Sequence, residues 1–276
     1  MRAESFDVSE RLVRDPRNAA MFQGRGLKMI ASRNNDLANG NADSHSLPDV
    51  HYTVSVVIPT LNEAQNIPDV LFRLPKVVDE VIIVDGHSED DTVEVATKVL
   101  PTAKVILQRK NGKGDALRSA FEHARSDIIV QMDADGSMDP LEIEKFAAVA
   151  SEGYDVVKGS RYLFGGGSTD LSAKRSFGNR MFVRLVNLLF STEYTDLCYG
   201  FMAFRKDALD RLNDTLRCRG FQIETEMCIK AKKLGLRVTE VPSFERKRAH
   251  GSSRLCLIRD GFRILSIILT EFLKNR

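Results

Sequence analysis

Short runs of β-branched residues alternate along the chain with stretches in which apolar residues recur every three or four positions. The runs cover residues 54–58, 81–84, 104–107 and 127–130, and a fifth follows at 155–158. The amphipathic stretches lie near residues 64–74, 91–100, 115–124 and 141–151. Short apolar runs are typical of buried parallel strands, and three- and four-residue spacing is typical of helices. The alternation predicts an α/β fold with a doubly wound, mostly parallel, Rossmann-like sheet that binds ligands at the carboxyl ends of its strands.

The pattern changes after residue 158. Residues 159–170 contain three consecutive glycines and are predicted to form a loop. The remaining pattern predicts a helix at 175–190, a strand at 201–204, a helix at 223–234, a strand at 237–241 and a last helix from about residue 255. We expect this half to form the acceptor side of a site that lies in one catalytic domain, residues 51–276.

The first fifty residues have no sustained periodicity, and residues 32–49 are mostly polar or small. This composition predicts a mobile N-terminal extension, residues 1–50. The segment lacks the uninterrupted apolar run of a signal peptide. The apolar run at 264–269 is far shorter than the roughly 20 residues that span a bilayer. We therefore expect a cytoplasmic protein that does not cross a membrane.

Composition excludes several classes of protein. The 276 residues carry 40 Lys and Arg against 38 Asp and Glu, a net charge of +2, which gives no general field for nucleic acid. The four cysteines, Cys198, Cys218, Cys228 and Cys256, are far apart in sequence and contain no C-x-x-C pair. This spacing favours reduced thiols over a disulfide framework or a zinc site.

The strongest chemical motif is a D-x-D, formed by Asp133 and Asp135 directly after a predicted strand. Two carboxylates at a strand end offer the hard oxygen ligands that Mg²⁺ or Mn²⁺ prefers, with positions left for a diphosphate. Three other interpretations stay open here. A helix cap would use one carboxylate, a calcium loop would need Gly where Met138 stands, and a phosphoaspartyl phosphatase would normally place its motif after the first strand.

Other strand ends carry polar residues too. Pro59 to Glu63 follow the first strand, Asp85 ends the second, and Lys113 stands between two glycines before a predicted helix. A carboxylate after a second strand suits a ribose or a base, and a lysine near a helix start suits an anion. No G-x-G-x-x-G and no P-loop motif is present, which disfavours a dinucleotide or a P-loop nucleotide.

Taken in order, these motifs resemble those of the family 2 glycosyltransferases of GT-A fold, and within them the dolichyl- or polyprenyl-phosphate mannose and glucose synthases. The similarity runs from about residue 54 to residue 255. It rests on the segments 59–63 (PTLNE), 84–88 (VDGHS), 112–114 (GKG), 133–135 (DAD), 159–162 (GSRY), 196–201 (DLCYGF), 220–224 (GFQIE) and 251–255 (GSSRL).

The resemblance implies a role for each matching residue. The nucleotide sugar would meet Pro59, Leu61, Glu63, Asp85, Lys113, Asp133, Arg248 and Arg254. The metal, Mg²⁺ or Mn²⁺, would be held by Asp133 and Asp135. The catalytic set would comprise Asp135, Arg161, Arg175 and Asp196, with the two arginines on the acceptor phosphate. Where archetypal members have a further metal ligand, Gln, this sequence has Ser137.

The implied reaction is an inverting transfer of mannose or glucose from GDP-mannose or UDP-glucose to a polyprenyl or dolichyl phosphate. A phosphate acceptor is already anionic and needs no strong base, so a structural role for Asp196 is as consistent as a catalytic one. Two alternatives stay open. The chain could transfer sugar to a soluble hydroxyl acceptor, with Asp196 as the first candidate base, or it could be a non-catalytic subunit that binds a sugar nucleotide.

The C-terminal segment has a second, independent pattern. From Cys228 onward there are twelve Lys and Arg against four Asp and Glu, and apolar residues crowd positions 264–273. This pattern fits a helix that lies on an anionic membrane surface, and it fits equally a helix that packs its apolar side on the core. Peripheral contact with the cytoplasmic face of a membrane, or with a membrane subunit, is therefore expected as one of two outcomes.

Overall fold

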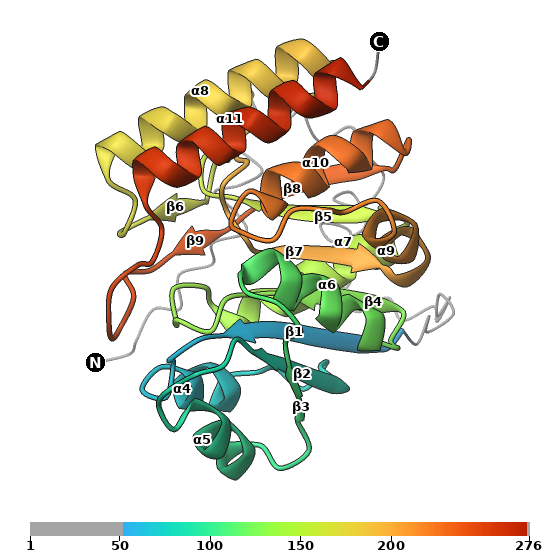
Figure 1. Cartoon of the computed structure of the whole chain (residues 1–276). Coiled ribbons are helices and arrows are strands. Elements are labelled where there is room, and N and C mark those ends of the chain that lie inside the picture. Colours follow the sequence, from blue (N-terminus) through green and yellow to red (C-terminus); the bar gives the residue numbers. More distant parts are fainter. Residues whose placement is uncertain (1–51, 275–276) are drawn as a thin grey trace, which may run out of the picture. The chain divides into compact units, whose positions relative to one another are not determined.

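A seven-stranded sheet forms the centre of the chain in the computed structural model, which describes residues 52–274 (Figure 1). The predicted extension, residues 1–50, lies outside the described residues. The spatial order of the strands is β3-β2-β1-β4-β7-β5-β8. The strands are β1 (Val54–Thr60), β2 (Glu80–Asp85), β3 (Lys104–Leu107), β4 (Ile128–Gln131), β5 (Val156–Ser160), β7 (Met202–Arg205) and β8 (Val238–Pro242).

The sheet is parallel except at β7. Strands β3, β2, β1 and β4 run in one direction, with Val56 opposite Val81 in the β1–β2 pair. Strand β7 is antiparallel to both β4 and β5, and β5 pairs with β8 in parallel. The predicted fold class, an α/β fold of GT-A type with a mostly parallel sheet, is confirmed.

Helices cover both faces of the sheet, which explains why the strands read as continuous apolar runs. One layer contains α4 (Ile67–Phe72), α5 (Thr92–Val99) and α7 (Ile143–Ser151), which follows a short 3₁₀ turn, Pro140–Glu142. The other contains α6 (Lys113–His123), α8 (Ala173–Phe190), α9 (Lys206–Asn213), α10 (Ile223–Lys233) and α11 (Leu257–Leu273).

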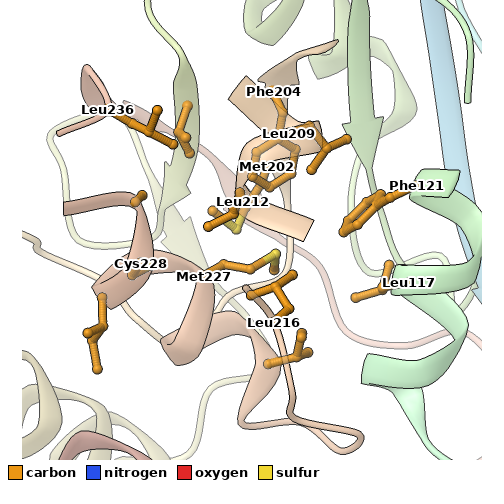
Figure 2. Close-up of a cluster of buried hydrophobic side chains, with 14 of the residues drawn as sticks. Leu117, Phe121, Met202, Phe204, Leu209, Leu212, Leu216, Met227, Cys228 and Leu236 are labelled. Carbon is orange, nitrogen blue, oxygen red and sulfur yellow. The ribbon is translucent and has the colours of Figure 1, made fainter. Parts of the chain in front are cut away.

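Successive strand residues point to opposite layers, so each face has its own hydrophobic core. In β1, Val57 belongs to one cluster while Val56 and Ile58 belong to the other. Figure 2 shows part of the first cluster, where Phe121 of α6 and Phe204 of β7 meet edge to face at 5.8 Å between ring centres. These two cores hold the strand ends, and therefore the loops that follow them, in fixed positions.

Three sequence predictions differ from the structure. Residues 104–107 were expected to be a buried strand, but β3 is an edge strand and Leu107 is exposed, because nothing pairs with its outer side in the described sheet. The charged helix α9 was not predicted. Within the predicted loop 159–170, β6 (Gly167–Ser168) pairs with β9 (Phe244–Glu245) in a small second sheet.

Helices α8 and α11 lie side by side at the outer side of the second layer (Figure 1). The backbone of Gly261 in α11 lies against the ring of Phe182 in α8, and Phe272 lies beside Phe190, 6.3 Å between ring centres. Because later residues of one helix meet later residues of the other, the two helices run parallel. Both begin next to the carboxyl ends of the central strands, where the candidate site lies.

Candidate active site

A cavity of about 440 Å³ opens at the carboxyl ends of β3, β2, β1 and β4. This is the position that a doubly wound sheet offers to ligands. Of the twelve residues that the sequence nominated, nine line this cavity: Pro59, Leu61, Glu63, Lys113, Asp133, Asp135, Arg175, Arg248 and Arg254. The remaining three, Asp85, Arg161 and Asp196, do not line it.

Lys113 connects two acidic residues at the inner end of the cavity. Its Nζ lies 2.6 Å from Oδ1 of Asp133 and 2.7 Å from Oε1 of Glu224. Burial disfavours the ammonium, but the two carboxylates outweigh it and raise the pKa of Lys113. Burial raises the pKa of Asp133 to about 6, with Lys113 opposing the rise and the charges of Asp135 and Glu224 adding to it. A Cβ on Gly200 would lie within 2.8 Å of both Lys113 Nζ and Glu224 Oε1, so a larger residue there would displace the ends of these two side chains.

The glycines that flank Lys113 fix its place. Gly114 donates its N–H to the carbonyl of Arg219 at 2.7 Å, and a Cβ on Gly114 would lie 2.4 Å from the carbonyl oxygen of Cys218. Gly112 has a positive φ of 109°, which favours glycine. The start of α6 therefore packs directly on the backbone of residues 218–220, and Lys113 reaches into the cavity from a rigid base.

Arg248 joins Asp135 to Glu63 across the cavity. Its Nη1 lies 3.3 Å from Oδ2 of Asp135, and its Nη2 contacts Oε1 of Glu63. The loop that carries Arg248, residues 246–256 between β9 and α11, is held at the rim by a reciprocal pair. His250 N donates to Asn66 Oδ1 at 3.0 Å, and Asn66 Nδ2 donates to the carbonyl of His250 at 3.1 Å.

Asp133 and Asp135 have the donor chemistry for a divalent cation. Both carboxylates line the cavity and each already neutralises a cation, the ammonium of Lys113 or the guanidinium of Arg248. No group of three or more His, Cys, Asp or Glu side chains suited to a metal occurs within residues 52–274. Mg²⁺ commonly takes one or two carboxylates and completes its shell with water and substrate phosphates. These residues therefore fit an ion that is bound together with a diphosphate.

Asp85 is placed differently from the prediction. It is buried, and its carboxylate accepts hydrogen bonds from Ser88 N at 2.8 Å, Ser88 Oγ at 2.5 Å and Thr60 Oγ1 at 3.1 Å. The neighbouring Gly86 and Gln108 line the cavity instead. In this structure Asp85 thus shapes the loop after β2, and Gln108 is the polar side chain of this region that lines the cavity.

Arg161 and Asp196 form a buried pair and not a pair of cavity groups. Arg161 donates from Nε and Nη2 to the two carboxylate oxygens of Asp196, at 2.7 and 3.0 Å, and from Nη1 to Glu245 at 3.0 Å. Asp196 has no exposed surface. The guanidinium also lies over the ring of Tyr199. The expected contact of Arg161 with an acceptor phosphate, and the use of Asp196 as a base, are therefore not what this geometry provides, because both groups are saturated and enclosed.

Sequence reasoning missed several residues that line the cavity, among them the polar side chains of Gln108, Lys247 and Arg259. Gln108 directly follows the edge strand β3, and this strand-end position could have marked it as a cavity residue. Lys247 and Arg259 flank the matched motif at 251–255 on either side, within a segment already known to be basic. The side chains of Lys247 and Arg254 make no ion pair with any described residue, so both are available to an anion.

Every carboxylate that lines the cavity is engaged by a cation. The pairs are Glu63 with Arg248, Asp133 with Lys113, Asp135 with Arg248, Asp170 with Arg175, and Glu245 with Arg161. No histidine lines it. The described site thus offers positive charge for phosphates and contains no free carboxylate or imidazole that could take a proton.

The chain belongs to glycosyl transferase family 2, whose sequence profile matches residues 55–212. Glycosyltransferase AglJ of Haloferax volcanii is 35% identical over 214 residues, which cover 75% of this chain and 68% of AglJ. An undecaprenyl-phosphate 4-deoxy-4-formamido-L-arabinose transferase of Pseudomonas savastanoi is 30% identical over 244 residues, or 78% of this chain and 68% of the transferase. Glycosyltransferase AglD of Haloferax volcanii is 32% identical, but the match spans only 35% of its length.

Solved structures agree with the fold. Glucosyl-3-phosphoglycerate synthase of Mycobacterium tuberculosis, in complex with Mn²⁺, UDP-glucose and phosphoglyceric acid, has a TM-score of 0.63 at 25% identity, with 80% of each chain covered. The same enzyme with Mg²⁺ and UDP also scores 0.63, at 22% identity, covering 80% of this chain and 79% of the enzyme. The family makes this chain a glycosyltransferase, an enzyme that uses a nucleotide sugar.

Proposed function

We propose that the enzyme transfers a hexose, mannose or glucose, from a nucleotide diphosphate sugar to a polyprenyl or dolichyl phosphate, with inversion at the anomeric carbon. The observation that carries this proposal is the pairing of all five cavity carboxylates with cations, next to the unpaired cations Lys247 and Arg254. A hydroxyl acceptor needs a group that removes its proton, whereas a phosphate arrives as an anion and needs positive charge. The undecaprenyl-phosphate transferase among the relatives supports the same class of acceptor.

In the proposed reaction, an oxygen of the acceptor phosphate attacks the anomeric carbon. The bond between that carbon and the diphosphate breaks, and the nucleotide diphosphate leaves with the electron pair. A divalent cation at Asp133 and Asp135, Mg²⁺ or Mn²⁺, would stabilise the charge on the leaving diphosphate. Arg248 and Arg254 face the same diphosphate from the 246–256 loop, and their guanidinium groups suit two phosphate oxygens at once.

The remaining residues bind and orient. Pro59, Leu61 and Glu63 line the cavity beside Gly86 and Gln108, and together they form the proposed pocket for base and ribose. Lys113 positions Asp133 through the ion pair between its Nζ and Oδ1 of Asp133. Arg175 stands at the start of α8, paired with Asp170 at 2.8 Å, and is the proposed contact for the acceptor phosphate.

The location follows from the proposed acceptor. All four cysteines are free thiols, which supports a reducing, cytoplasmic setting. Within residues 52–274 no helix has the length and apolar character that crossing a bilayer requires. An enzyme that uses a polyprenyl phosphate must reach a membrane, so we propose peripheral contact with its cytoplasmic face, directly or through a membrane subunit.

The proposal is tested in two stages. Thermal unfolding is measured with GDP-mannose, UDP-glucose and related donors, each with and without Mg²⁺ or Mn²⁺. A donor at about 100 times its Kd adds about 2.7 kcal/mol of stability, which is easily detected, and the donor that stabilises identifies the base. Labelled donor is then offered with a polyprenyl phosphate in detergent or with 3-phosphoglycerate, and the product is partitioned between an organic and an aqueous phase.

We expect the label in the organic phase, in a product that depends on divalent cation. Label in the aqueous phase alone, with 3-phosphoglycerate as acceptor, would overturn the polyprenyl proposal and favour a hydroxyl acceptor. That alternative has the structural likeness to glucosyl-3-phosphoglycerate synthase in its favour and the absence of a free base in the cavity against it.

A further inference from the structure

The outer sides of α8 and α11 expose large apolar side chains that pack on no other described element. Ile258 of α11 is 73% exposed, Phe262 is 69% exposed, and Phe177 and Leu188 of α8 are 71% and 79% exposed. The core-facing residues of these helices are separate positions, such as Ile264 and Ile268 of α11. One side of the C-terminal helix therefore packs on the core, as one of the two sequence interpretations expected, and another side remains apolar and exposed.

Helical spacing gathers these residues into one outward stripe on each helix. In α11 the positions 258, 262, 269 and 273 lie within about 60° of each other at 100° per residue, opposite the core-facing positions. In α8 the positions 177, 181 and 188 do the same. Each stripe points outward, away from the core-facing side of its own helix, and the two parallel helices lie side by side, so both stripes belong to the outer side of this pair. We call this surface the α8–α11 face, and it consists of Phe177, Met181, Leu188, Ile258, Phe262, Leu269 and Leu273.

Positive charge surrounds this face without negative charge among it. Helix α8 contains no Asp or Glu, and the two acidic residues of α11, Asp260 and Glu271, are buried. The exposed cations of α8 are Lys174, Arg180 and Arg184, none of which forms an ion pair with a described residue. On α11 the exposed cations Arg259 and Arg263 pair with Asp260, and Lys274 at its end pairs with Glu271, but their guanidinium and ammonium groups remain at the surface. An apolar centre with a rim of Lys and Arg is complementary to a bilayer that carries anionic headgroups.

The face begins at the mouth of the cavity. Arg175, two residues before Phe177, and Arg259, the residue after Ile258, both line the cavity. A bilayer that touches the first turns of both helices therefore lies next to the cavity rim. A phosphate on a lipid in that bilayer could reach Arg175 without leaving the membrane surface.

We propose that the α8–α11 face is a membrane-docking surface that selects anionic phospholipid and holds the cavity mouth at the headgroup level. Docking itself is independent of the proposed function; its purpose, delivery of a lipid phosphate, rests on that function. A protein partner or a second copy of this chain would also cover an apolar face, but neither accounts for a rim formed entirely of cations.

The test is vesicle flotation of the full chain without donor or acceptor, so that its result is independent of catalysis. Vesicles of phosphatidylcholine alone are compared with vesicles that also contain phosphatidylglycerol. The variant Ile258→Gln/Phe262→Gln removes apolar contact, and Lys174→Gln/Arg184→Gln removes two exposed charges of α8. Phe72→Gln is the matched control, because Phe72 is 75% exposed but lies on α4 in the opposite layer.

We expect the wild type and Phe72→Gln to float with phosphatidylglycerol vesicles, and each double variant to lose at least tenfold in vesicle affinity. The wild type should bind phosphatidylcholine alone much more weakly. All variants should keep the melting temperature and the stabilisation by nucleotide sugar, since the substituted side chains do not line the cavity.

Three results would overturn the proposal. The first is wild-type protein that stays with neither vesicle. The second is double variants that float as well as the wild type. The third is a dimer in sedimentation that Ile258→Gln/Phe262→Gln dissociates, because the face would then be covered by a second copy.

Discussion

Arg248 contacts two carboxylates on different loops, Asp135 after β4 and Glu63 after β1. A guanidinium has enough donors to serve both, and its charge does not titrate at neutral pH. The arrangement keeps a cation on the D-x-D motif before any ligand arrives. If Asp135 held a divalent ion as proposed, Arg248 would be free to contact the phosphates bound with that ion.

At Asp135, replacement by Ala should abolish transfer while leaving the fold intact. Asp135 lies at the cavity and contacts Arg248 and Ser137 N at its partly exposed rim, so the melting temperature should fall by only a few degrees. Removing one electrostatic stabiliser of a developing charge typically costs about 100-fold or more in rate. Turnover and metal-dependent stabilisation by the donor are measured together. Full activity in Asp135→Ala would remove this residue from the proposed metal site.

Arg161 is expected to matter for stability more than for acceptor binding. Arg161→Met leaves Asp196 and Glu245 without their cation, and breaking a buried pair in this way typically costs about 3–5 kcal/mol. Urea unfolding checks this, with Arg254→Met as the control, since Arg254 is exposed and should change stability by no more than about 0.5 kcal/mol. Unchanged stability together with a raised KM for the acceptor would return Arg161 to the acceptor site.

At the scale of elements, the junction between α6 and residues 218–220 sets the position of Lys113. Gly114→Ala should cost about 1–3 kcal/mol, the usual penalty of overpacking, because its Cβ would meet the backbone of Cys218 and Arg219. It should also weaken donor binding by moving Lys113. Gly178→Ala is the control: no atom lies within 4 Å of a Cβ there, and Ala within α8 should gain about 0.5–1 kcal/mol. Equal stability of the two variants would contradict the tight junction.

The first turn of α11 should respond to acid. Asp260 accepts a hydrogen bond from Cys256 N at 2.8 Å; burial opposes its charge, but this bond with those from Arg259 and Arg263 lowers its pKa. A lowered pKa in the folded state means that the stabilisation is complete above the unfolded value, near 3.8, and is lost as pH falls through the lower folded value. Asp260→Asn keeps an acceptor for Cys256 N but removes the charge that faces Arg259 and Arg263, so it should be about 1 kcal/mol less stable at pH 7.

The difference in unfolding free energy between the wild type and Asp260→Asn should narrow as the pH approaches about 3, since the wild type then loses the charge of Asp260 as well. Urea unfolding of both proteins across this pH range measures it. The difference should be constant above about pH 5. A stability difference that stays unchanged down to the lowest pH at which both proteins fold would show that the charge of Asp260 does not contribute to stability.

At the scale of the whole molecule, most of the fold could be predicted because its strands are buried on two faces and their apolar runs are unmistakable. Strand β3 was misjudged because Val105 and Ile106 resemble a central strand, while edge position depends on what pairs with it. Helix α9 was not predicted because four of its eight residues are charged, which hides its apolar spacing. Such positions are decided by tertiary neighbours and not by local pattern.

In the candidate site, too, some residues could be predicted from the sequence and others could not. The strand-end motifs placed Glu63, Asp133 and Asp135 at the cavity, since parallel strands end at one edge. Arg161 and Asp196 look from sequence like surface charges available to a ligand, because charged residues are rarely buried. Only the folded chain shows that they bury each other. The α8–α11 face needed the structure too, since the sequence does not show which of two apolar stripes the core covers.

The pairing of every cavity carboxylate has a consequence for water. Water is the most abundant nucleophile in any cell, and a glycosyltransferase that holds an activated sugar risks wasting it by hydrolysis. Water attacks effectively when a base takes its proton, and this cavity keeps each carboxylate occupied by a cation. An acceptor that brings its own negative charge has no such need. The described site thus disfavours hydrolysis of a bound donor before its acceptor arrives.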